Sequence, residues 1–100
     1  MAGMRHEIIL APEAVEDLEA LRANVRTEVK AAIERHLRHE PTKQSKSRIK
    51  RLRDLSRPQF RLRVGHVRVY YDVKAAGVEV LAIVEKGHAQ HWLEREGEKT

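Results

Sequence analysis

An alternating pattern around one glycine constrains this chain more than any other feature of its sequence. From Phe60 to Asp72, apolar residues alternate with arginines on both sides of Gly65. A period of two is what a strand with one buried and one open face requires, and the short Val-Gly-His link is typical of a hairpin. The pattern therefore predicts two antiparallel strands, and on the first of them Leu62 and Val64 face a core with Phe60.

The outward face of this hairpin gathers positive charge. Arg61 and Arg63 on the first strand are expected beside Arg68 and Tyr70 on the second, because both polar faces belong to the same side of one sheet. Three guanidinium groups in such proximity repel one another, and stability alone gives no reason to gather them. An anionic partner gives such a reason. The alternative is a solvated face whose arginines pair with acids elsewhere in the chain.

The charge of the chain is concentrated in one block. The formal net charge is +5, but the region from Pro41 to Arg68 holds ten lysines and arginines against a single acid, Asp54, which gives this block a net charge of +9. Such a block on a folded domain is expected to bind phosphate backbones or a strongly acidic protein. With 100 residues and 41% hydrophobic residues, the sequence predicts one small domain over residues 1–100 with a single core.

The cellular setting follows from what the sequence lacks. The chain has no cysteine, which excludes disulfides and thiolate metal sites and favours a reducing compartment. No basic segment leads into an apolar stretch at the start, and the apolar runs are too short to span a membrane. The sequence therefore predicts a soluble, cytoplasmic protein without a membrane partner.

The other segments predict an α+β fold. A strand over residues 5–10 precedes Pro12, which suits a helix start, and the first helix is expected to end near residues 22–24. Val25, Val29, Ile33 and Leu37 mark a second helix that stops before Pro41, after a break at residues 23–24. Together they form a helical hairpin. We expect this hairpin to cover one face of a small antiparallel sheet, and the other face to be open and basic.

Three further segments complete the expected order. Residues 42–53 are basic and polar and are interpreted as a connecting loop with at most one turn of helix. Residues 78–84 are almost continuously apolar, which is typical of a strand buried on both faces and predicts the central strand. Residues 89–96 are expected to form a short final helix.

Metal and nucleotide chemistry find little support in the sequence. His36 and His39 are three residues apart, as are His88 and His91, but neither pair comes with a third ligand. The chain has no phosphate-binding glycine loop, serine nucleophile motif or paired catalytic carboxylates. We therefore expect no metal and no cofactor. Cleavage of RNA by its own 2′-hydroxyl remains possible, since it needs cations, a base and an acid but no metal.

Such a reaction assigns roles by chemistry. The hairpin arginines suit the phosphate, because a guanidinium fork matches its oxygens. An arginine is a poor base, so the titratable candidates are His88, His91, Tyr70 and Tyr71. A base could stack on Trp92 or Tyr70. The alternatives are that the histidines are ordinary exposed residues and that Trp92 covers the sheet edge as part of the core.

The sequences of these segments resemble those of a known group of proteins. The chain reads Pro-Glu-Ala-Val-Glu-Asp-Leu in its first helix, then Ile-Lys-Arg-Leu-Arg-Asp-Leu, Phe-Arg-Leu-Arg-Val-Gly-His-Val-Arg-Val-Tyr-Tyr-Asp-Val and finally Glu-Lys-Gly-His. In this order of elements and in the hairpin above all, it is similar to the RelE/ParE superfamily, the toxins of bacterial type II toxin-antitoxin modules. The resemblance extends over nearly the whole chain.

The resemblance implies a ribosome-dependent mRNA endonuclease, the activity of the RelE-like branch. Carried over to this sequence, the catalytic positions are Arg61, Arg63 and Arg68, with His88 as the substitute proton donor. Many such nucleases have an arginine followed by a tyrosine in the tail, and this chain departs from that pattern. The expected RNA-binding residues are Lys50, Arg51, Arg53, Tyr70, Lys86, His91 and Trp92.

Two other functions stay open. The ParE-like branch has the same fold but inhibits DNA gyrase and has no nuclease chemistry, and retention of the three hairpin arginines favours the nuclease over it. A module that binds RNA or protein without turnover is the third possibility. For either kind of toxin, the resemblance implies an antitoxin partner whose acidic segment covers the basic face, and the local charge of +9 suits such a partner.

Overall fold

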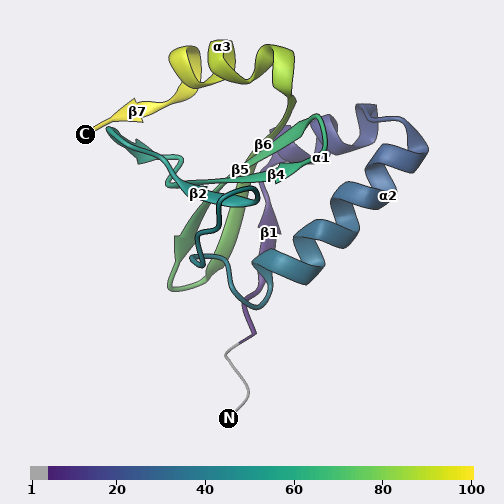
Figure 1. Cartoon of the computed structure of the whole chain (residues 1–100), viewed down its shortest axis with the longest axis horizontal. Helices are drawn as coiled ribbons and strands as arrows, with labels where there is room; N and C mark the ends of the chain where they lie inside the picture. The colour runs from purple at the N-terminus through teal and green to yellow at the C-terminus, as the bar shows by residue number, and fades with distance from the viewer. Residues whose placement is uncertain (1–4) are drawn as a thin grey trace.

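The computed structural model describes residues 5–100, which form three α-helices, one π-helical turn and seven strands (Figure 1). In chain order these elements are β1 (Ile8–Leu10), α1 (Pro12–Ala20), α2 (Ala23–Ala32), η1 (Ile33–Leu37), β2 (Ile49–Arg51), β3 (Leu55–Arg57), β4 (Phe60–Val64), β5 (Val67–Lys74), β6 (Gly77–Glu85), α3 (Lys86–Glu96) and β7 (Glu98–Lys99). Within this range no helix has the length and apolar character that crossing a bilayer requires.

The main sheet has five strands in the order β1-β6-β5-β4-β2. The strands β4, β5 and β6 follow one another as antiparallel neighbours, which confirms the predicted run of three sequential strands. Two expectations need correction. The first strand, β1, runs parallel to β6, so the sheet is mixed. The strand in the middle is β5, and the apolar strand β6 lies between β5 and β1. Its continuous apolar run reflects burial on both faces.

Helices α1 and α2 cover one face of this sheet, as the periodicity predicted. Helix α1 begins at Pro12, whose fixed φ and missing N–H suit a first helical position, and it buries Leu18. Helix α2 and the turn η1 bury Val29, Ile33 and Leu37, three of the apolar positions spaced four apart. They join the inward residues of the hairpin in one continuous core.

The junction between α1 and α2 is fastened by an arginine side chain. The break falls at Leu21 and Arg22, just before the expected residues 23–24. The last carbonyl groups of a helix lack partners within the helix. Here the guanidinium of Arg26 is the hydrogen-bond donor for two such carbonyl groups. Its Nε donates to the Leu18 carbonyl at 3.2 Å and its Nη2 to the Leu21 carbonyl at 2.8 Å. This arginine therefore has a structural role.

The segment interpreted as a basic loop contains an edge strand. Strand β2 pairs antiparallel with β4, and Ile49 lies opposite Leu62 with only 4% of its surface exposed. The guanidinium of Arg51 lies 5.1 Å from the centre of the Phe60 ring, where a cation–π contact holds it. Sequence periodicity missed β2 because a three-residue strand with a single buried side chain shows no alternation.

The second face of the sheet is covered in part by α3. This helix begins at Lys86, before the expected start at Ala89, and the Lys86 N–H donates to the His66 carbonyl at 2.7 Å. In Figure 1 the yellow-green α3 lies at the top, away from the blue α2, and β7 leads back toward β3. The expectation of a second face open to solvent is therefore wrong over the part that α3 covers.

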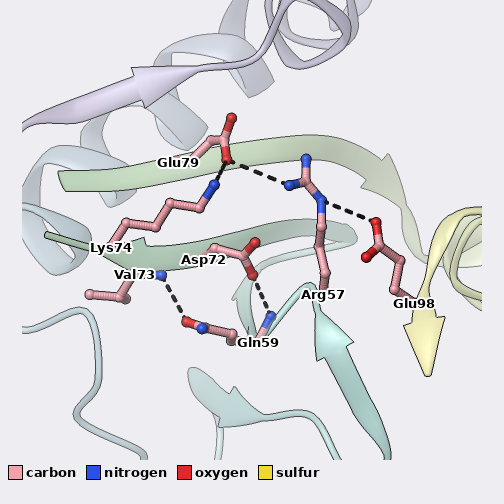
Figure 2. Close-up of polar contacts among 7 residues, drawn as sticks. All are labelled: Arg57, Gln59, Asp72, Val73, Lys74, Glu79 and Glu98. Atoms are coloured by element: carbon pink, nitrogen blue, oxygen red, sulfur yellow. Dashed lines mark hydrogen bonds and ion pairs between the residues drawn. The ribbon is translucent and has the colours of Figure 1, made fainter. Parts of the chain in front are cut away.

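A polar network joins the small β3–β7 pair to the main sheet (Figure 2). Arg57 on β3 lies between Glu79 of β6, at 3.9 Å, and Glu98 of β7, at 3.8 Å. Asp72, at the end of the alternating pattern, is 3% exposed, and its carboxylate accepts the Gln59 N–H at 2.8 Å. Asp72 therefore fixes the entry into β4, which is a structural task.

Candidate functional site

The register of the strands places the hairpin arginines on one face of the sheet, as their alternation predicted. Arg61 on β4 pairs with Tyr70 on β5, and Arg63 pairs with Arg68. Lys50 on β2 lies opposite Arg61. Residues directly opposite each other on neighbouring strands share a face. We call Lys50, Arg61, Arg63 and Arg68 the arginine face.

The arginine face is less open than the sequence predicted. Arg63 is exposed and Arg61 is half-buried, but Arg68 is only 7% exposed. Its Nη1 donates to the carbonyl groups of Gly65, at 2.9 Å, and Val67, at 3.2 Å, so the guanidinium folds against its own hairpin turn. Burial lowers the pKa of Arg68, and the charges of Arg61 and Arg63 add to this effect. Arg68, one of the three arginines expected on this face, is therefore held at one end by main-chain groups of its own turn.

Arg61 keeps one unsatisfied group. Its Nε is buried and has no hydrogen-bond partner among residues 5–100. Leaving a buried N–H unpaired costs about 1–3 kcal/mol. An acceptor that reached Arg61 would recover that free energy.

Tyr70 does not offer the open stacking surface that was expected of it. Its ring is stacked on Trp92 of α3, with the centroids 5.0 Å apart and an angle of 7° between the planes. Tyr70 is 1% exposed, and this burial raises the pKa of its phenol, against the opposing effect of Arg61 and Arg68. Trp92 therefore covers the sheet, which is the alternative that the sequence left open, and Tyr70 is not accessible to RNA in this arrangement.

Tyr71 lies on the opposite face, in the core. Its ring stacks on Phe60 with the centroids 5.5 Å apart, and its hydroxyl donates to the Pro41 carbonyl at 2.6 Å. Burial raises the pKa of Tyr71 far above the ordinary value for a tyrosine. It cannot exchange a proton with a substrate on the arginine face.

The histidines of the tail lie on α3. His88 and His91 are exposed, as is Lys86 at the start of this helix. Within residues 5–100 no hydrogen bond or ion pair joins either histidine to a hairpin arginine, and no group of three histidine, cysteine or acidic side chains is placed to hold a metal ion. Tyr70, the titratable candidate that pairs with Arg61, is buried. The proton-transfer role of His88 stays a prediction.

The basic segment before the hairpin divides between the two faces. Lys50 joins the arginine face through its pairing with Arg61. Arg51 lies over the Phe60 ring, and Arg53 is exposed in the turn that precedes β3. Of the three residues expected to bind RNA here, the register brings only Lys50 to the hairpin arginines.

A second group of basic side chains escaped the sequence reasoning. Arg35 and His36 on the helical side, and Arg48 before β2, line a cavity together with Arg63. These residues come from separate segments, and no local sequence pattern predicts that they lie close together. The helical periodicity places Arg35 on an outer face of its helix, which is the only hint that the sequence contains.

Comparison with known proteins gives a family and a fold. The family model for the ParE toxin of type II toxin-antitoxin system, parDE, matches residues 8–90. No curated protein matches the sequence.

Three solved structures have a similar fold. A RelB–RelE antitoxin-toxin complex from Methanococcus jannaschii is matched with a TM-score of 0.66 and 19% identity, over 84% of this chain and 96% of that chain. The RelBE2 toxin-antitoxin complex from Mycobacterium tuberculosis gives 0.69 and 21%, over 82% and 92%. A RelE–RelB complex from Pyrococcus horikoshii OT3 gives 0.60 and 21%, over 84% and 98%.

Proposed function

This chain belongs to the ParE toxin family of type II toxin-antitoxin systems, within the RelE/ParE superfamily, and we propose that it arrests growth by inhibiting DNA gyrase without cleaving RNA. The sequence alone favoured mRNA cleavage. The packing of α3 on Tyr70, beside the arginine face, reverses this order. The observation that carries the proposal is the stack of Trp92 on Tyr70, which leaves Tyr70 only 1% exposed.

The packing of Trp92 on Tyr70 matters for function because RNA cleavage needs several groups at one open site. A nuclease of this kind must seat a phosphate, take a proton from the 2′-hydroxyl and return one to the leaving oxygen. Here Arg68 is held by main-chain carbonyl groups and Tyr70 lies beneath α3. An inhibitor that acts by docking on a protein needs none of this chemistry, and gyrase is the target of the ParE-like branch that the sequence resembles.

We also infer that a cognate antitoxin neutralises this toxin. The three structural relatives are antitoxin-toxin complexes. The local net charge of +9 over residues 41–68 suits an acidic segment that is disordered when free and orders on binding.

Ribosome-dependent mRNA cleavage is the second candidate, and one observation favours it. The register lines up Lys50 with three arginines on a single face, which is more positive charge than stability accounts for. This function requires α3 to move away so that Tyr70 becomes accessible, and it gives His88 the role of proton donor.

The test compares the two targets directly. Purified chain is added to DNA gyrase and relaxed plasmid, and supercoiling is followed on gels. In parallel, the chain is induced in bacteria and new mRNA 5′ ends are mapped. We expect supercoiling to be inhibited and mRNA to stay intact while growth stops.

Arg61→Ala and Trp92→Ala serve as matched variants in both arms. New 5′ ends at translated codons that disappear in Arg61→Ala would overturn the gyrase proposal in favour of the nuclease. Cleavage that appears only in Trp92→Ala would show that α3 holds back a nuclease site. Growth arrest with neither effect would point to a member of the fold that acts only by binding.

A further inference from the structure

A cleft of about 320 Å³ lies between the helical layer and the edge of the sheet. Its basic side chains are Arg35 and His36 of η1, Arg48 before β2 and Arg63 of β4. We call these four residues the basic cleft. Glu28 is the one acidic residue in the lining. Three arginines from three segments thus face one solvent-filled space.

Like most arginines of residues 5–100, those of the basic cleft have no acidic partner, and what sets them apart is that three of them meet at one cavity. Arg38 pairs with Glu34, and Arg57 lies between two glutamates. Within residues 5–100, Arg35, Arg48 and Arg63 make no ion pair. Like charges at one cavity repel one another, so the cleft costs free energy until an anion enters it.

A hydrogen bond between Arg48 and His36 holds the Arg48 guanidinium in position in the cleft. Arg48 Nη1 lies 2.9 Å from His36 Nε2. A guanidinium can only donate, so Nε2 must accept, and His36 is therefore neutral in this arrangement. Burial lowers the pKa of His36, and the charges of Arg48 and Arg35 lower it further, against a smaller opposite effect of Glu40. The neutral ring orients Arg48 without cancelling its charge.

We propose that the basic cleft is a binding site for a phosphate group, held by the guanidinium groups of Arg35, Arg48 and Arg63. A carboxylate has two oxygens and is satisfied by one guanidinium fork. Phosphate carries more charge and more acceptor oxygens, which matches three separate arginines. The site lies beside the helices and shares Arg63 with the arginine face, whereas α3 stacks on Tyr70, outside the cleft lining.

The test measures binding of pyrophosphate to the folded chain by titration calorimetry at low ionic strength. Arg48→Gln and Arg35→Gln should each weaken binding by about tenfold, since each removes a charge-assisted contact. Glu28→Gln should tighten binding, because it removes the one negative charge from the lining. Arg95→Gln removes an arginine from α3, outside the cleft, and should change the affinity by less than about twofold.

The arginine variants should weaken binding and Glu28→Gln should strengthen it. Because poor folding can only weaken binding, tighter binding by Glu28→Gln keeps the test valid even if one variant folds poorly. In the NMR spectrum of the intact chain, pyrophosphate should shift the His36 ring signals before those of His88. Equal losses in Arg48→Gln and Arg95→Gln would overturn the proposal, as would the absence of binding. An acidic peptide that occupies the cleft far more tightly than pyrophosphate would also overturn it and assign the cleft to a carboxylate.

Two phosphate sources are separated by a second titration. Single-stranded and duplex oligonucleotides are compared with pyrophosphate and a nucleoside triphosphate. If oligonucleotide binding depends on Arg35 and Arg48, the phosphate belongs to a nucleic-acid backbone. If only the small anions depend on these arginines, the site takes a free phosphate compound. Both results support a phosphate site.

Discussion

Arg68 of the arginine face and the arginines Arg35 and Arg48 of the basic cleft are used in opposite ways, although the two sites share Arg63. On the arginine face, Arg68 is 7% exposed and donates to two carbonyl groups of its own hairpin turn. In the basic cleft, Arg35 and Arg48 are exposed, and neither has an acidic partner among residues 5–100. An arginine whose donors are used by the main chain stabilises the fold, whereas one held in position but unpaired remains available to a ligand.

This difference shows why a count of charges is a poor guide to a binding site. The hairpin has the more conspicuous sequence pattern, yet Trp92 and Tyr70 close part of its face. The cleft has no pattern, yet it presents a cavity of about 320 Å³. If the comparison is right, substitutions beneath α3 should lower stability first, and substitutions in the cleft should lower ligand binding first.

The largest expected effect is that of Tyr70→Ala. Removing a ring that is 1% exposed leaves a cavity between β5 and α3, and we expect the free energy of unfolding to fall by about 3–4 kcal/mol. Urea denaturation measures it. Tyr70→Phe keeps the stacked ring and is the matched control, with a loss below about 1 kcal/mol. A similar small loss for both variants would mean that α3 does not pack on the sheet in solution.

Next in size is the contrast between two arginines that pair across the hairpin. Arg68→Ala removes two hydrogen bonds from a charged donor and should lower the unfolding free energy by about 2 kcal/mol. Arg63→Ala removes an exposed side chain and should change it by less than about 0.5 kcal/mol. Both values come from the same denaturation experiment. Equal effects would erase the distinction between a structural and an available arginine.

A smaller effect is expected from the pH dependence of stability. The pKa of His36 is lowered in the folded state from its ordinary value of 6.5, so the unfolded chain binds this proton more readily. Stability should therefore be complete above pH 6.5 and should fall as the pH decreases from 6.5 through the lowered pKa. Denaturation at several pH values should show a flatter profile for His36→Gln.

His39→Gln is the control for this measurement, because His39 is exposed three residues further along the chain. Its profile should follow that of the unchanged protein. A profile for His36→Gln that is as steep as the unchanged one would contradict the neutral, accepting state of His36 in the basic cleft.

The smallest expected effect concerns the network in Figure 2. Arg57 and Glu98 are 3.8 Å apart near the surface, and such pairs contribute little in water. Glu98→Gln should lower the unfolding free energy by less than about 0.5 kcal/mol, and added salt should reduce the difference. A loss as large as that of Arg68→Ala would show that β7 holds α3 in place over the arginine face.

Elements with a strong period were predictable from the sequence, as was the family. The alternation around Gly65 predicted β4, β5 and the face shared by Arg61, Arg63 and Arg68. Apolar positions four apart predicted α2. The resemblance to the RelE/ParE superfamily is confirmed by the family model over residues 8–90. In each case one local pattern determines which side of an element is buried.

Features that depend on contacts between distant segments were not predictable. The face of Arg68 follows from alternation, but the position of its guanidinium depends on the carbonyl groups of the hairpin turn. The Trp92 ring can stack equally well on a ligand base or on the Tyr70 ring. Which of the two it contacts depends on the position of α3, which the sequence pattern does not fix. Strand β2 has one buried residue, Ile49, and takes its shape from pairing with β4. The basic cleft joins three segments that are distant in the sequence, and no periodic pattern links their arginines.

The parallel pairing of β1 with β6 also has a consequence for synthesis of the toxin. Strand β1 lies at the edge of the sheet, with Ile8 opposite Val78, so its one neighbour there is made only after α1, α2 and the strands β2 to β5. A nascent fragment that stops before β6 leaves β1 without its partner and the core without one of its walls. A translation product that stops before β6 therefore cannot complete the main sheet of this fold.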